Sequence, residues 1–129
     1  MAEATGQARK LGLKPGMRVA LDGAPDGWAL TDPPSGLIAA DASAADLIVA
    51  FFTTADSIDP RVGDLAQRIF PAGSLWCLWP RRASGHTSDI TDVVLREIVL
   101  RHGLVDTKVA AVDTDWSGLK FVWRRDARH

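Results

Sequence analysis

The sequence predicts one α/β domain, a three-layer sandwich whose sheet is mostly parallel and closes with a C-terminal antiparallel hairpin. Two segments, residues 46–52 and 75–79, are typical of strands that are covered on both faces, because the first is apolar throughout after Asp46 and the second is apolar at every position. Amphipathic helical patterns follow them at residues 61–70 and 89–102. Residues 107–125 hold two strand-like segments around a turn, which predicts the hairpin.

The first half of the chain contributes only short elements. A proline–glycine turn precedes residues 17–21, which we expect to form the first strand. Residues 22–28 follow as a loop rich in glycine and aspartate, and residues 36–40 are a weak edge strand. Pro33 and Pro34 limit any helix between these segments to one turn.

Both helices of the second half have an apolar face. In the first helix this face consists of Val62, Leu65, Ala66 and Ile69. In the second helix we expect Ser88 or Asp89 to cap the start and Gly103 to end the last turn. The apolar stripe of that helix is predicted to be Ile90, Val93, Val94 and Ile98.

Size and composition exclude several classes of function. The 129 residues suffice for a single domain, and we expect residues 1–8 to be flexible. The formal net charge is -1, so the overall electrostatic field of the protein does not favour nucleic acid or a membrane surface as a partner. No apolar segment reaches the length of a transmembrane helix, and we expect no secretory signal, so a cytoplasmic location is predicted. Cys77, the single cysteine, lies in an apolar run and is expected to be buried and inert.

Several segments resemble class I S-adenosylmethionine-dependent methyltransferases, which have a Rossmann-like fold. Residues 13–19 are similar to the lead into their first strand, residues 46–52 to their fourth strand, and residues 70–76 to the turn that opens their fifth. The helix end at Gly103, followed by a hairpin, resembles their last helix and final strand pair. The whole chain more closely resembles small bacterial proteins known as a domain of unknown function, a truncated and degenerate version of this fold.

The resemblance implies a cofactor site at a glycine-rich turn, but the turn departs from the family's pattern. Gly23 and Gly27 match the outer glycines, whereas Pro25 stands at the middle glycine and Leu21 at the preceding acidic residue. Residues 28–46 are too few for the helix, strand and helix that would carry a ribose-binding carboxylate. We therefore expect no cofactor, and S-adenosylmethionine is disfavoured.

Ligands of open α/β sheets bind at the carboxyl ends of the strands, where the loops at residues 22–28, 53–59 and 81–88 are expected to meet. Arginines, a histidine and hydroxyl groups at a helix start suit a small anionic ligand or a nucleotide. The alternative is a solvated loop that only caps the helix. The candidate ligand-binding residues are Gly23, Gly27, Trp79, Arg81, Arg82, His86 and Ser88.

No catalytic residue or metal site is predicted. Asp113 and Asp115 place two carboxylates close together, but turn chemistry explains them better than a metal does. The three histidines are too scattered for a zinc site.

Three functions remain open from the sequence. The favoured one is a non-catalytic, methyltransferase-like module for binding or protein interaction. The alternatives are a binder of a small anionic ligand or nucleotide, and a reduced S-adenosylmethionine-dependent methyltransferase. Because only residues 36–40 cover the edge beside the first strand, we expect that edge to pair in a homodimer.

Overall fold

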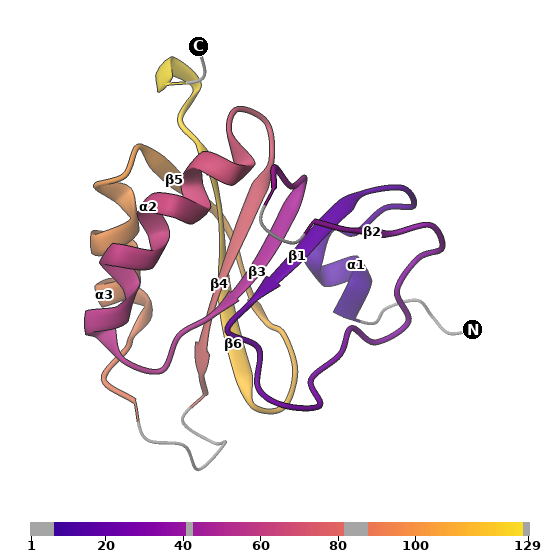
Figure 1. Ribbon diagram of the computed structural model, residues 1–129. Coiled ribbons are helices and arrows are strands. Elements are labelled where there is room, and N and C mark those ends of the chain that lie inside the picture. The colour runs from indigo at the N-terminus through magenta and orange to yellow at the C-terminus, as the bar shows by residue number, and fades with distance from the viewer. Residues whose placement is uncertain (1–6, 41–42, 82–87, 128–129) are drawn as a thin grey trace.

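The computed structural model describes residues 7–40, 43–81 and 88–127 (Figure 1). These residues form one mixed sheet in the order β2-β1-β3-β4-β6-β5. The first four strands in this order are parallel, and β6 is antiparallel to both β4 and β5. The predicted fold class is confirmed. The strands are β1 (Arg18–Asp22), β2 (Ile38–Ala39), β3 (Leu47–Phe51), β4 (Ser74–Pro80), β5 (Leu104–Ala111) and β6 (Trp116–Trp123).

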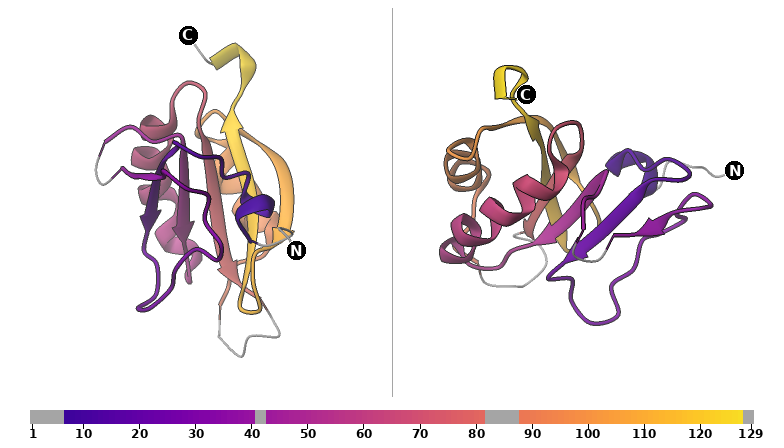
Figure 2. Two further views of the ribbon diagram at one scale, coloured as in Figure 1. Left: turned by 90° about the vertical axis from the view of Figure 1, so that its right-hand side faces the viewer. Right: turned by 45° about the horizontal axis from the view of Figure 1, so that its top comes forward.

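Two different layers cover the sheet. Helices α2 (Ile58–Ile69) and α3 (Asp92–Leu100) pack on one face. The short helix α1 (Gln7–Leu11) and side chains from residues 24–37 cover the other face. Figure 2, left, views the molecule from this second side, with α1 in front of β6. Within the described residues, no helix is long and apolar enough to cross a membrane.

Strand β4 lies at the centre of both cores, as its apolar sequence predicts. Leu75 and Cys77 face the α2–α3 side, whereas Trp76 and Leu78 face the α1 side, and all four are fully buried. The indole N–H of Trp76 donates to Leu11 O at 2.9 Å, so this buried polar group also fixes the end of α1.

Helix α2 begins earlier than predicted. It starts at Ile58, after a short 3₁₀ turn η1 (Ala55–Ser57), and Pro60 lies within its first turn. Proline is tolerated there because the first N–H groups of a helix have no intrahelical acceptor. The predicted apolar face, extended by Ile58, is buried as expected.

Helix α3 differs from the prediction in its cap. Thr91 is the N-cap residue, and its hydroxyl accepts from Val94 N at 3.2 Å. Asp89 instead accepts from Ala55 N at 2.8 Å, and Ser88 donates to Thr53 O at 2.9 Å. The two side chains predicted to cap α3 therefore connect the segment that precedes α3 to the residues that follow β3.

The apolar stripe of α3 is also rotated relative to the prediction. Leu95 and Val99 are fully buried, whereas Val93 is 56% exposed. The helix sequence is apolar in most positions, so periodicity alone does not select the buried face. Gly103 follows α3 with φ +89°, which confirms the predicted left-handed terminator.

Candidate binding pocket at the carboxyl ends of β1 and β3

A pocket of about 450 Å³ opens at the carboxyl ends of β1 and β3. This volume lies in the usual range for small-molecule sites, roughly 300–1,000 Å³. The position agrees with the rule that open α/β sheets bind ligands at the carboxyl ends of their strands. The pocket is lined by Gly23, Pro25, Phe51, Thr53, Thr54, Ser57, Arg61 and Trp116.

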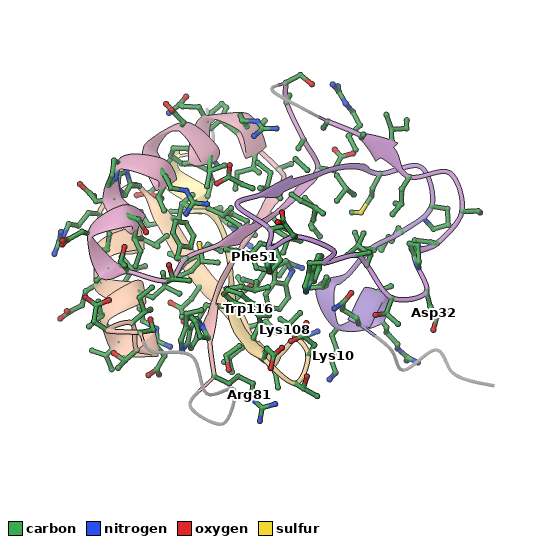
Figure 3. The ribbon with its side chains drawn as sticks, turned by 60° about the horizontal axis from the view of Figure 1, so that its bottom comes forward. Lys10, Asp32, Phe51, Arg81, Lys108 and Trp116 are labelled. Carbon is green, nitrogen blue, oxygen red and sulfur yellow. The ribbon has the colours of Figure 1, made fainter. Side chains whose placement is uncertain are left out.

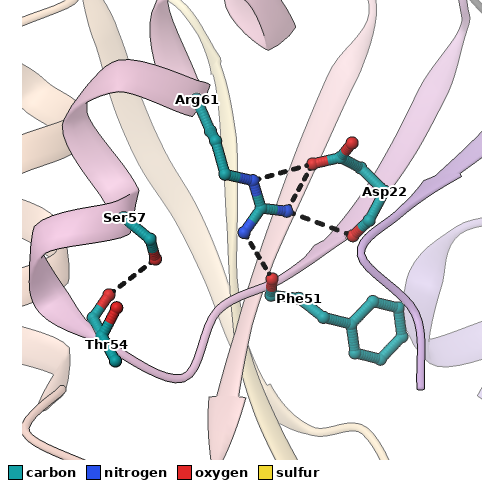
Figure 4. Close-up of polar contacts among 5 residues, drawn as sticks. All are labelled: Asp22, Phe51, Thr54, Ser57 and Arg61. Carbon is teal, nitrogen blue, oxygen red and sulfur yellow. Dashed lines mark hydrogen bonds and ion pairs between the residues drawn. The ribbon is translucent and has the colours of Figure 1, made fainter.

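Arg61, in the first half of α2, joins the ends of β1 and β3 (Figure 4). Its Nε donates to Asp22 Oδ2 at 3.1 Å, and its Nη2 contacts the same carboxylate oxygen and donates to Asp22 O at 3.3 Å. Its Nη1 donates to Phe51 O at 2.8 Å, and the guanidinium lies 4.1 Å from the ring centroid of Phe52. The pair therefore fixes both strand ends, and the charge of Arg61 is already compensated inside the fold.

The guanidinium of Arg61 fills the space directly over Gly23. This glycine has φ +72°, and a Cβ atom added to it would lie 2.8 Å from Arg61 Nη2 and 3.1 Å from Phe51 O. A glycine in such a loop normally lets its backbone approach a ligand closely. Here the protein's own arginine occupies the space into which a Cβ of Gly23 would project.

Aromatic rings form the apolar wall of the pocket. The ring of Phe51 makes edge contacts with Trp28 at 4.8 Å and with Trp116 at 5.0 Å between centroids. Both Phe51 and Trp116 are more than nine-tenths buried. The indole N–H of Trp28 donates to Asp113 Oδ2 at 3.0 Å, which links the loop after β1 to the turn between β5 and β6.

Turn chemistry accounts for the aspartates before β6, as predicted. Asp113 Oδ1 accepts from Asp115 N at 2.8 Å and from Trp116 N at 2.9 Å. Arg81, just after β4, donates from Nη1 to Asp113 O at 3.1 Å. In the described parts of the chain, no group of three or more histidine, cysteine or acidic side chains is placed to hold a metal ion.

Solved structures share this arrangement of strands and helices. Magnesium protoporphyrin IX methyltransferase from Synechocystis PCC 6803, with bound SAH, superposes with a TM-score of 0.54 at 11% identity, over 85% of this chain and 75% of that one. A putative methyltransferase from Thermoplasma acidophilum gives 0.55 at 11% identity, over 88% and 70%. LepI, in complex with SAH and a substrate analogue, gives 0.51 at 13% identity, over 91% and 39%.

The chain has a methyltransferase fold. At these identities the likeness concerns the fold alone. No family model matches the sequence, and no curated protein matches it.

In this methyltransferase fold, strand β2 ends well before the level of the pocket at the carboxyl end of β1. Ala39, the last residue of β2, pairs with Val19, whereas β1 continues for three more residues to Asp22. At about 3.3 Å per residue, β2 therefore ends about 10 Å short of the carboxyl end of β1. Residues 23–37, which connect β1 to β2, contain no helix, in agreement with the predicted lack of room.

The predicted site residues lie in several places. Gly23 lines the pocket, and Gly27, with φ +79°, belongs to a turn in which Trp28 N donates to Pro25 O. Trp79 is half-buried against the α2–α3 core, on the opposite face from Trp76. Ser88 bonds to Thr53, beside the pocket, and Arg81 bonds to the β5–β6 turn. Arg82 and His86 lie outside the described residues.

The sequence interpretation missed Arg61, Phe51, Ser57 and Trp116. The loop at residues 53–59, expected at the site, contains Ser57, and Arg61 lies just beyond it in the first half of α2. Trp116 comes from a hairpin far along the chain. Only the antiparallel pairing of β6 with β4 places its first residue beside the carboxyl end of β3.

Proposed function

We propose that this chain is a non-catalytic, methyltransferase-like binding module. Its pocket takes a small, uncharged organic ligand with a flat apolar ring. The observation that carries the proposal is the position of Arg61, whose guanidinium fills the space over Gly23 and is paired with Asp22.

The residues of the pocket do not fit S-adenosylmethionine held as in the fold's usual site. Such a site needs close backbone approach at a glycine-rich turn, and here Arg61 fills that space over Gly23. Pro25 occupies the place of the middle glycine. A ribose hydroxyl is normally held by a carboxylate beyond the neighbouring strand, but β2 ends about 10 Å below the pocket.

The lining of the pocket favours an uncharged ring. Phe51, Trp116 and Pro25 supply apolar surface, whereas Thr53, Thr54 and Ser57 supply hydroxyl groups. A few placed polar groups on a mostly apolar wall are typical of small-molecule sites. Because Arg61 and Asp22 neutralise each other, the pocket offers little net charge to an anionic ligand.

Nuclear magnetic resonance of the tryptophan indoles tests this proposal. The indole N–H groups of Trp28, Trp76 and Trp123 donate to acceptors inside the fold, and Trp116 is assigned with a Trp116→Phe variant. We expect indole or phenol at millimolar concentration to shift the Trp116 signal and the amides of Thr53 and Thr54. S-adenosylmethionine is expected to leave them unchanged.

A pocket-filling variant provides the specificity control. Thr54→Phe places a ring at the pocket and is expected to abolish the shifts caused by indole or phenol. Thr107→Phe, at an exposed position on β5, is the matched control and is expected to retain them. The proposal is wrong if the neutral rings leave the pocket signals of the wild-type protein unmoved.

A further inference from the structure

Three of the chain's four lysines, Lys10, Lys108 and Lys120, lie where α1 and the turn after it meet the β5–β6 hairpin, and the charge of Lys14 acts on Lys120. Lys10 is in α1, Lys14 follows α1, Lys108 is in β5 and Lys120 is in β6. Figure 3 shows Lys10 and Lys108 close together below the helix α1. None of the four lines the pocket described above.

Hydrogen bonds to the main chain hold two of these amines in place. Lys108 Nζ donates to Lys10 O at 2.8 Å, at the carboxyl end of α1. Lys10 Nζ donates to Ala111 O at 3.1 Å, on β5. A Cβ atom on Gly12 would lie 3.4 Å from Lys120 Nζ, so the third amine reaches the turn after α1. The packing of α1 on the β5–β6 hairpin therefore organises the cluster.

Within the described residues, the positive charges of this cluster lie near one another and form no ion pair with an acidic side chain. Lys108 and Lys120 are directly opposite each other in the β5–β6 ladder, where like charges are destabilising. Burial, together with the charges of Lys108 and Lys14, lowers the pKa of Lys120. The ion pairs between described residues all involve arginine or histidine, and none includes a lysine.

We propose that Lys14, Lys108 and Lys120 form a binding site for the phosphate group of a small molecule. A phosphate dianion offers several acceptor oxygens to the three ammonium groups and removes the repulsion between Lys108 and Lys120. Lys108 uses one of its three N–H donors on Lys10 O, which leaves two for a ligand. Lys10 helps to position α1 and lies beside the site. This proposal does not depend on the function proposed for the pocket.

Isotope labelling of lysine gives a direct test, because the protein has only four lysine side chains. The ¹³Cε signals are followed at pH 8 while inorganic phosphate or pyrophosphate replaces chloride at constant ionic strength. We expect saturable shifts of Lys14, Lys108 and Lys120, and a rise in the pKa of Lys120 when phosphate is bound. Shifts that do not saturate, or that sodium chloride reproduces, would overturn the proposal without any variant.

Two substitutions to methionine separate the effect of the site from that of net charge. Lys120→Met is expected to weaken phosphate binding by about tenfold, the loss of one charge-assisted hydrogen bond. Arg101→Met removes the same charge from an exposed residue at the end of α3, on the other face of the sheet, and is expected to change the affinity by less than about twofold. An equal loss of phosphate affinity in both variants would mean that only the net charge matters, and would contradict the assignment of Lys120 to the site. The amide spectrum of each variant verifies its fold.

Discussion

Arg61 and Asp22 form a fork-like ion pair that joins the start of α2 to the end of β1, and the same guanidinium donates to Phe51 O at the end of β3. The two residues are far apart in the sequence, so the pair is a tertiary clamp on the two strands that open the pocket. Its side chains are about one-third exposed, 31% for Arg61 and 35% for Asp22. The clamp also determines what can occupy the space over Gly23.

Removing the guanidinium is expected to destabilise the fold. Arg61→Met keeps the length of the side chain but loses every hydrogen bond to Asp22 and Phe51 O. We expect the free energy of unfolding to fall by about 1–2 kcal/mol, less than for a fully buried pair because water reaches both groups. Urea unfolding measures the change. Arg61→Lys is expected to recover only part of it, since an ammonium lacks the planar fork.

Two glycines of the same loop provide a matched pair. Gly23→Ala introduces a Cβ against Arg61 and Phe51 O at φ +72°, whereas Gly27→Ala meets nothing within 4 Å at φ +79°. We expect Gly27→Ala to lower the free energy of unfolding by about 1 kcal/mol, from the backbone alone. Gly23→Ala is expected to lower it by about 2–3 kcal/mol, because packing strain adds to the backbone cost. Equal losses in thermal or urea unfolding would argue against close contact at Gly23.

Lys120 is expected to destabilise the free protein at neutral pH. Its pKa is lowered in the folded state by burial and by the charges of Lys108 and Lys14. Lys120→Met keeps the apolar stem and should raise the free energy of unfolding at pH 7 by about 0.2–1 kcal/mol.

The effect of pH on this difference has a defined sign. Between the lowered pKa of the folded state and the ordinary pKa of the unfolded chain, the unfolded state binds more protons at Lys120. The wild-type protein therefore gains stability as the pH rises through this window, and the advantage of Lys120→Met shrinks. Urea unfolding of both proteins at pH 7 and pH 10 measures how this stability difference changes. An advantage that grows with pH would contradict the account.

Cys77 is expected to be unreactive in the folded protein. Burial, the largest influence, raises the pKa of its thiol far above the usual range. A thiol reagent such as 5,5′-dithiobis(2-nitrobenzoate) should label it only after unfolding by urea. Rapid labelling of the native protein at pH 8 would show that β4 is accessible and would contradict its central position.

The buried strands were the most predictable part of the fold. Residues 47–52 and 75–79 are apolar throughout, a pattern typical of strands covered on both faces. The face of α3 was less predictable, because six of its nine residues are apolar, Val93, Leu95 and Val99 among them. Tertiary packing against the sheet, rather than periodicity, selects Leu95 and Val99 for burial.

The candidate site was predictable in place but not in its residues. The rule for open sheets located it at the carboxyl ends of the strands, and Gly23 lies there. The clamp formed by Arg61 and Asp22 has no local signature in the sequence, because it depends on how α2 packs over β1 and β3. The same holds for the lysine cluster, which exists only because α1 packs beside the hairpin.

Isothermal titration calorimetry with S-adenosylmethionine tests the central claim most directly. If Arg61 occupies the space over Gly23, the wild-type protein should give no heat beyond dilution with S-adenosylmethionine or S-adenosylhomocysteine at millimolar concentration. Saturable one-site binding to the wild-type protein that Thr54→Phe abolishes would place the cofactor in the pocket and contradict the account.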